Sequence, residues 1–259
     1  MSITHDLIFS YQNMLTTNVS VTKHYLLLRC LPRKSSFYEI LKLDFSRYGF
    51  DEMKDGLDSF SNPICYGGVL NAHKTLMWNS SGVLRTQIYE YEDKKESYLF
   101  KLPSALTLVD ESMKEFIDDK TLPNSPFDRA YYLTELVHNL ISYEAYVTNV
   151  NTTASEAFSL KKGVCQDYAH VLLAFLRYKN IPSKYVSGLI SGDGKTHAWV
   201  EILIGDKWYG FDPTHNRKID FGYVKLAHGR DANDCSVCRG VFTGDATQQM
   251  SVHVCVGEL

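Results

Sequence analysis

Three short segments contain residues whose types suit a thiol nucleophile, a general base and an orienting carboxylate. Cys165 lies in GVCQDYAH, His197 lies in THAWVEI, and Asp212 lies in GFDPTHNR. A cysteine attacks a carbonyl carbon as the thiolate, a histidine moves the proton, and a carboxylate orients the imidazole. The three residues therefore predict thiol chemistry through a covalent acyl intermediate.

The segment that follows Cys165 predicts a buried helix with the thiol in its first turn. Residues 168–176 are almost all apolar, and Asn180 and Pro182 are ordinary signals for the end of a helix. Unpaired backbone N–H groups and the positive end of the helix dipole gather at a helix start. They favour a thiolate, and they can also bind the oxyanion of a tetrahedral intermediate.

The segments around His197 and Asp212 predict the two strands of a hairpin. Residues 196–204 and 207–211 are the expected strands, joined by a Gly-Asp turn. In this register Trp199 lies opposite Asp212, and His197 is the diagonal neighbour of Asp212 on the same face. Diagonal Cβ atoms lie about 7–8 Å apart or less, which an imidazole and a carboxylate can bridge. A β-bulge would change this register.

Residues beside the nucleophile are candidates for supporting roles. Gln166 can bind substrate or cap the helix, and we expect Asp167 to act as the cap. His170 follows Cys165 by five residues, a spacing that turns it away from the thiol, so we expect a structural role.

Residues beside the base and the carboxylate also fit ordinary structural roles. Trp199 lies two residues after His197 and is typical of a core aromatic residue. His215 and Asn216 follow the second strand, where they either line the cleft or, as we expect, form a turn.

The C-terminal quarter contains residues with metal or redox spacing. Cys235 and Cys238 are three positions apart, and His253 and Cys255 share one face of an expected last strand over 249–256. These four residues are candidates for a zinc site, and Cys235 and Cys238 for a reversible disulfide. The spacing of the second pair is not a usual zinc pattern, so we expect free thiols, no metal and no cofactor.

The three segments resemble the motifs of the transglutaminase-like superfamily, whose core is related to papain-like cysteine proteases. The resemblance covers most of the chain, with specific motifs from about Tyr143 to Arg217. It implies Cys165 as nucleophile, His197 as base and Asp212 as the group that orients the imidazole. It also implies Tyr143 as a candidate donor to the oxyanion, beside the default of a core tyrosine.

The first hundred residues resemble the N-terminal region found ahead of bacterial transglutaminase-like domains. The resemblance rests on the segment DSFSNP at 58–63 and on His73 before an apolar strand. Alternating apolar and polar residues with regular turns, one of them at 79–82, predict a small β-sandwich. We therefore expect an α+β protein, with a β-rich domain over 1–105 and a papain-like transglutaminase core over 106–259.

Composition excludes some classes of partner. The chain has 259 residues, 44% of them hydrophobic and 22% charged, and a net charge of -3, which gives no electrostatic reason to expect nucleic acid or anionic membrane. No apolar run reaches the ~18 residues of a membrane-spanning helix. The first residues lack the pattern of a signal peptide, and six cysteines are too few for a disulfide scaffold, so we expect a cytoplasmic protein.

The expected reaction is acyl transfer from a peptide or protein amide through a thioester on Cys165. Water as acceptor gives a cysteine peptidase or amidase, which we favour because water needs no dedicated pocket. A lysine amine as acceptor gives a cross-linking transglutaminase. A catalytically inactive binding module is a function of a different class that the sequence allows, and acetyl transfer from a thioester donor is a weaker third. The sequence does not indicate an oligomeric state.

Overall fold

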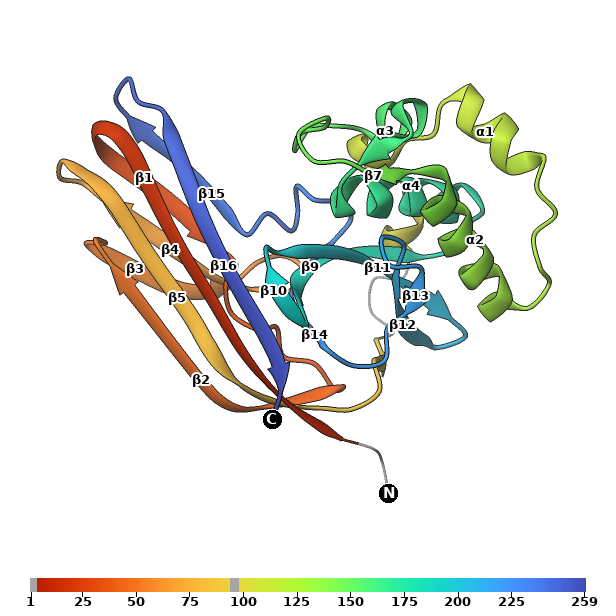
Figure 1. Ribbon diagram of the computed structural model, residues 1–259, viewed down its shortest axis with the longest axis horizontal. Coiled ribbons are helices and arrows are strands. Elements are labelled where there is room, and N and C mark those ends of the chain that lie inside the picture. Colours follow the sequence, from red (N-terminus) through yellow and green to blue (C-terminus); the bar gives the residue numbers. More distant parts are fainter. Residues whose placement is uncertain (1–3, 94–97) are drawn as a thin grey trace.

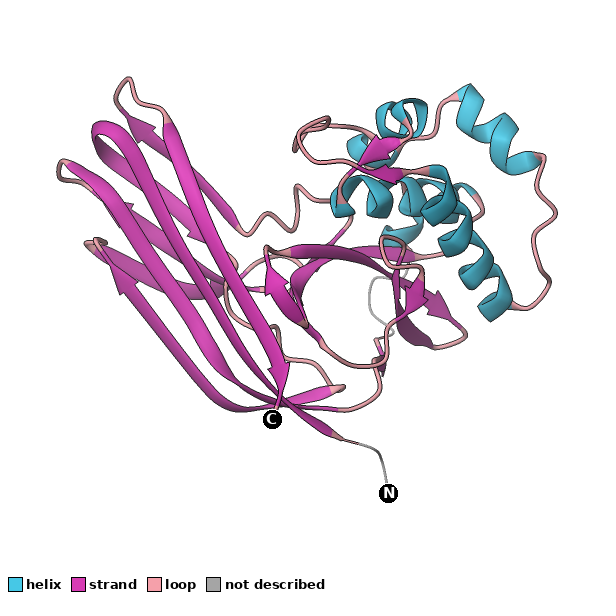
Figure 2. Cartoon of the chain, viewed as in Figure 1, coloured by secondary structure: helices cyan, strands magenta, loops and turns pink. Residues whose placement is uncertain are grey.

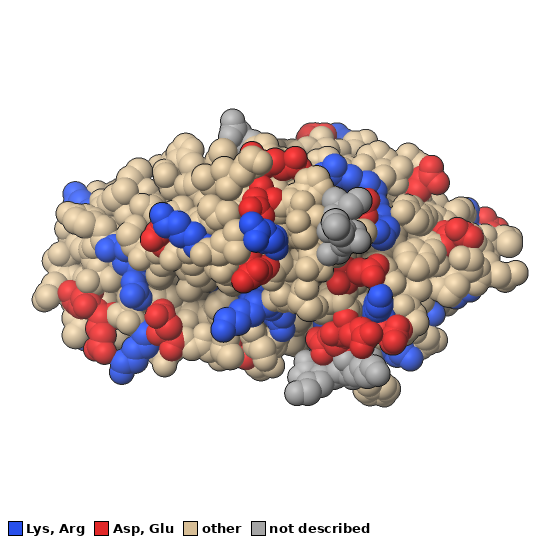
Figure 3. Space-filling view, turned by 90° about the horizontal axis from the view of Figure 1, so that it is seen from below, with Lys and Arg blue, Asp and Glu red and all other residues tan. Residues whose placement is uncertain are grey.

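The computed structural model describes residues 4–93 and 98–259 of the chain (Figure 1). A sheet of long strands forms one side of the molecule, and a smaller sheet with helices packed on it forms the other (Figures 1 and 2). No helix in the described part of the chain has the length and apolar character to cross a bilayer. On the face shown in Figure 3, acidic and basic side chains are interspersed, as the small net charge leads one to expect.

The larger sheet has eight strands connected through its first strand. Its members are β1 (His5–Leu28), β2 (Tyr38–Tyr48), β3 (Glu52–Leu57), β4 (Pro63–Val69), β5 (His73–Thr86), β10 (Gly192–Gly194), β15 (Cys238–Thr243) and β16 (Gln248–Glu258). The first part of β1 pairs with β5 and β16, and its last part pairs with β4 and β15. The pairing shifts register between the two parts, near Lys23, whose φ is +48°. The two separate sheets of the expected β-sandwich are therefore not confirmed.

Two features of this sheet differ from the sequence-based expectations. The turn expected at 79–82 is wrong, because β5 runs through these residues and pairs with β1 on one side and β2 on the other. Position 82 requires glycine, because a Cβ on any other residue would lie 2.2 Å from the carbonyl oxygen of Lys42 on β2. The expected last strand exists as β16, and with β15 it completes the N-terminal sheet. The division of the chain at residues 105 and 106 stays a prediction.

The smaller sheet positions the candidate base and carboxylate. Its order is β13 (Arg217–Lys218), β12 (Lys207–Asp212), β11 (His197–Ile204), β9 (Ser183–Ile190) and β14 (Tyr223–Gly229), and β6 (Glu90–Glu92) pairs with β12. Ile204 pairs with Lys207, so the hairpin register is the one that the short turn predicts. A two-stranded parallel pair, β7 (Ser142–Tyr143) and β8 (Lys162–Gly163), lies just before the nucleophile helix.

The helices pack on this smaller sheet and bury the helix of Cys165 at their centre. They are α1 (Glu111–Asp118), α2 (Pro126–Leu140), α3 (Ala154–Leu160) and α4 (Cys165–Tyr178), with short 3-10 turns η1 (Leu99–Lys101) and η2 (Ala105–Thr107). Every residue of α4 from Asp167 to Arg177 is buried, as the apolar run predicts. The thiol therefore projects from the end of a rigid, fully packed element.

Candidate active site

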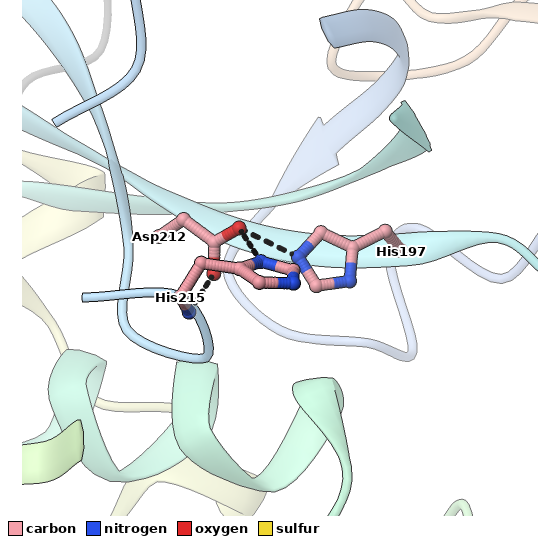
Figure 4. A group of neighbouring side chains, drawn as sticks. All are labelled: His197, Asp212 and His215. Carbon is pink, nitrogen blue, oxygen red and sulfur yellow. Dashed lines mark hydrogen bonds and ion pairs between the residues drawn. The ribbon is translucent and has the colours of Figure 1, made fainter. Parts of the chain in front are cut away.

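Asp212 is the centre of a hydrogen-bond cluster at the end of β12. Its Oδ2 accepts from His197 Nε2 at 2.8 Å and from His215 Nδ1 at 2.7 Å (Figure 4). The same oxygen accepts from the Tyr223 hydroxyl at 2.7 Å. Its Oδ1 accepts the backbone N–H groups of Thr214 and His215. Burial alone would raise the pKa of Asp212, but these donors hold it well below its usual range. The carboxylate is therefore ionised and fixed in one orientation.

His197 lies between this carboxylate and the candidate nucleophile. Nε2 donates to Asp212, and His197 and Cys165 line the same cavity. Burial disfavours the imidazolium, but the hydrogen bonds to Asp212 and Cys165 raise the pKa of His197 to about 9. At neutral pH the ring is therefore protonated and can hand a proton to a leaving group.

Cys165 occupies the first position of α4, and the residues around it shape that helix start. Asp167 Oδ2 accepts the backbone N–H of Val164 at 2.7 Å and the Thr148 hydroxyl at 2.7 Å, so Asp167 caps the helix as expected. Gly163 is required beneath this cap, because a Cβ there would lie 2.5 Å from Asp167 Oδ2.

The other predicted neighbours of the thiol differ in how close they come to it. Gln166 lines the same cavity as Cys165, and its amide donates to the carbonyl oxygen of Asn149 at 3.3 Å. Tyr143 is largely exposed, and partial burial together with the charges of Cys165 and Asp167 raises its pKa. The role of Tyr143 at the oxyanion stays a prediction.

His170 faces the core and lies apart from the thiol. It is completely buried, its Nε2 accepts the backbone N–H of Ala232 at 3.2 Å, and burial lowers its pKa to about 4. Its neutral ring thus ties α4 to the segment that leads into β15.

Trp199 packs in the core beside His197. It is completely buried, and its ring lies nearly parallel to His197, with 6.5 Å between ring centroids. Its Nε1 donates to the Tyr89 hydroxyl at 3.0 Å, and Tyr89 donates to Glu201 at 2.6 Å. Trp199 is therefore the core aromatic residue that the sequence indicates.

Glu201 is the centre of a buried ionic cluster beneath the hairpin. Lys225 Nζ donates to both carboxylate oxygens of Glu201, at 2.6 and 2.7 Å, and the Tyr91 hydroxyl donates to Oε2 at 2.7 Å. Burial would raise the pKa of Glu201, but the charges of Lys225 and Lys184 lower it, so Glu201 is ionised. The cluster fixes β6, β9, β11 and β14 against one another.

A cavity of about 970 Å³ opens in front of the thiol. Cys165, Gln166 and His197 lie on one wall, and residues of β1 and β15 from the larger sheet lie on the other. Among the described residues that line it there is no aspartate or glutamate, and Arg239 is a basic side chain on the wall formed by the larger sheet.

Comparison with known families bears directly on this arrangement. Residues 115–213 match the model of the transglutaminase-like superfamily, and this range includes Cys165, His197 and Asp212. Over this range the chain is similar to the transglutaminase-like superfamily. A crystal structure of a candidate cysteine protease from Cytophaga hutchinsonii superposes on 100% of this chain and 92% of its own, with a TM-score of 0.83 and 20% identity. The described chain therefore shares the fold of that protein over its whole length.

Relatives by sequence share part of the chain. An uncharacterized protein of Mycobacterium leprae is 32% identical over 124 residues, which are 44% of this chain and 44% of the relative. An uncharacterized protein of Mycobacterium tuberculosis is 27% identical over 164 residues, which are 56% of this chain and 52% of the relative. The chain therefore spans about half the length of the curated relatives it matches.

The structure does not bring together the residues that the sequence offers as metal candidates. Cys238 lies on β15, where it pairs with Leu28 of β1, whereas His253 and Cys255 lie on β16. All six cysteines are free thiols. Within the described ranges 4–93 and 98–259, the group with ligand atoms close enough for an ion is His197, Asp212 and His215. Both imidazoles approach one carboxylate oxygen at hydrogen-bond distance, so the cluster is satisfied without an ion.

Two members of the Asp212 cluster go beyond what the sequence alone predicts. His215 is a donor to Asp212 as well as part of the turn, and the Asp-Pro-Thr-His spacing is the signal that could have indicated it. Tyr223 lies on β14, and Arg217 holds its hydroxyl through two N–H groups at 3.1 and 2.9 Å. No local pattern connects β14 with β12, so the transglutaminase-like motif alone does not reveal this contact.

Proposed function

We propose that this protein is a cysteine hydrolase that cleaves the amide bond of a peptide or protein substrate through a thioester. The observation that carries the proposal is the buried pair of His197 and Asp212, joined by a hydrogen bond, with His197 and Cys165 lining one cavity. The similarity to the transglutaminase-like superfamily supports it, since thiol acyl transfer is what such a constellation can perform.

The reaction divides into acylation and deacylation. The Cys165 thiolate attacks the amide carbonyl carbon, and N–H groups at the start of α4 stabilise the oxyanion. When the C–N bond breaks, the imidazolium of His197 gives its proton to the leaving amine or ammonia. Neutral His197 then takes a proton from water, whose oxygen attacks the thioester carbonyl. The C–S bond breaks, the carboxylic acid leaves, and the thiolate and imidazolium are restored.

Two properties of the cavity support water rather than a lysine amine as the acyl acceptor. The cavity is open to solvent, since residues on both of its rims are exposed. The described lining residues offer no carboxylate to an incoming ammonium, and they include Arg239. A cationic acceptor is therefore disfavoured by like charge.

Intact-mass spectrometry with an acylating glutaminyl probe tests the proposal. We expect an adduct on the wild type and none on Cys165→Ala, while Cys255→Ala, which removes an exposed thiol on β16 outside the catalytic cavity, keeps the adduct. In buffer without an amine, hydrolysis of the adduct should release the carboxylic acid. Adding a primary amine to the buffer should leave the acid as the main product. Faster amine incorporation than acid release would contradict hydrolysis, and the absence of both an adduct and released acid with every probe would contradict catalysis.

A further inference from the structure

The wall of the cavity opposite Cys165 is the outer face of two neighbouring strands in the larger sheet. Tyr25 and Leu27 of β1 pair directly with Val241 and Arg239 of β15. Alternate residues of a strand share a face, so these four side chains lie together. All four line the cavity that contains the thiol. We refer to them as the sheet wall.

The sheet wall exposes apolar side chains to solvent instead of burying them in the core. Tyr25 is 50% exposed and Val241 is 70% exposed, and as a directly opposed pair they form one continuous apolar surface. On the opposite rim Val150, in the loop before α3, is also 70% exposed and lines the same cavity. Apolar residues on both rims suit a ligand that presents an apolar side chain between them.

The sheet wall also carries a fixed positive charge. Arg239 donates to Asn233 Oδ1 at 2.8 Å, which orients the guanidinium along the cavity wall. With no carboxylate among the described lining residues, a cationic side chain that enters the cavity along this wall meets Arg239 with no negative charge beside it on the lining. The wall therefore favours neutral or acidic residues over basic ones.

Two sets of hydrogen bonds hold the two walls of the cavity in place. β10, in the loop that precedes His197, pairs with β16 of the larger sheet, from Gly192 opposite Val256 to Gly194 opposite Val254. The Ser187 hydroxyl donates to the carbonyl oxygen of Cys235 at 2.9 Å, just before β15. The sheet wall is thus a preformed part of the site rather than a separate surface.

We infer that the sheet wall is a substrate-binding subsite. It holds an apolar side chain of the polypeptide whose amide carbonyl reaches Cys165, and Arg239 excludes lysine and arginine at the same place. The inference rests on the proposed function for the position of the reactive amide, and it assigns the substrate class: an extended peptide with an apolar, non-basic residue beside the scissile amide. The larger sheet therefore selects substrate.

Peptide binding to the inactive Cys165→Ala protein tests the subsite without requiring turnover. Fluorescence anisotropy is measured with glutaminyl peptides that carry leucine, phenylalanine, serine or lysine beside the glutamine. We expect the apolar peptides to bind about 10-fold tighter than the serine peptide and the lysine peptide to bind weakest. Adding Tyr25→Ala should remove the apolar preference, and Arg239→Glu should restore binding of the lysine peptide.

The matched control is Tyr48→Ala, because Tyr48 is a similarly exposed tyrosine at the end of β2 and lies outside the cavity. It should leave all four affinities unchanged, and thermal melts should show that each variant folds. Equal affinity for the four peptides, or an apolar preference that survives Tyr25→Ala, would overturn the subsite. So would a stable dimer in gel filtration that Tyr25→Ala dissociates, because the sheet wall would then bind a second copy of the chain.

Turnover by the wild type separates the subsite from the proposed function. Selective binding without hydrolysis of any peptide would leave the subsite standing and refute the hydrolase. Hydrolysis of all four peptides at the same rate would support the hydrolase and refute the subsite.

Discussion

The protonated His197 between Asp212 and Cys165 gives the protein a measurable contribution to stability that depends on pH. The folded-state pKa of about 9 lies above the ordinary histidine value of 6.5. At about 1.4 kcal/mol per pKa unit, the difference corresponds to about 3 kcal/mol of folding free energy. His197 is almost completely buried, so solvent screening reduces this value little. Because the pKa is raised, the contribution is fully present below pH 6.5 and is lost as the pH rises through 9.

Urea denaturation of the wild type and His197→Gln at pH values from about 6 to about 10 measures this contribution. The wild type should lose about 3 kcal/mol relative to the variant across this range. The comparison cancels other titrating groups that both proteins share. His253→Gln, at an exposed histidine on β16, is the matched control and should follow the wild type.

The same protonation should appear in catalysis. The imidazolium is the proposed donor to the leaving amine, so kcat/KM should fall as the pH rises past about 9. If the difference in unfolding free energy between wild type and His197→Gln is flat across the whole pH range, the argument for a protonated, paired His197 is refuted.

Three further substitutions test the surroundings of this pair. Asp212→Asn should lower kcat by roughly 10³–10⁴-fold while Cys165 remains in place, measured by steady-state hydrolysis; an unchanged kcat would remove Asp212 from the mechanism. Tyr223→Phe removes one donor to the carboxylate and should lower the free energy of unfolding by about 1.5–3 kcal/mol in urea titrations, and no loss would mean that the remaining donors suffice. Glu201→Gln leaves Lys225 without its buried partner and should cost about 3–5 kcal/mol, with part regained on adding Lys225→Met; no recovery in the double variant would show that the lysine charge is not the cause.

The chemistry of this site was predictable to the extent that it is local. A two-residue turn sets the hairpin register, so the spacing of His197 and Asp212 follows from the sequence between them. The helix start at Cys165 follows from the apolar run behind it, and the cap by Asp167 follows from its place in the first turn.

Contacts between distant segments were not predictable in this way. Tyr223 reaches Asp212 because β14 packs beside β9, and Glu201 meets Lys225 across the same sheet. Pairing of the last strands with β1 depends on which exposed edges meet in three dimensions, and one sequence does not encode that pairing in any local period. The sequence did not predict that β5 is continuous, because Asn, Ser and Gly usually mark turns. In the structure, residues 79–82 pair with β1 on one side and with β2 on the other.

The closure of the larger sheet by its last strand has a consequence for how the protein is made. Residues 248–258 pair with residues 7–17. The ribosome therefore makes β1 before β16, and β1 lacks this partner until the residues between the two strands have been synthesised. Contacts of such sequence separation slow folding, and an unpaired strand edge is prone to aggregation while it waits. The helices and hairpin around Cys165 can form from nearer neighbours. In a nascent chain the elements around Cys165 would therefore form before the larger sheet is complete. The sheet wall, which we propose selects the substrate, would be added last.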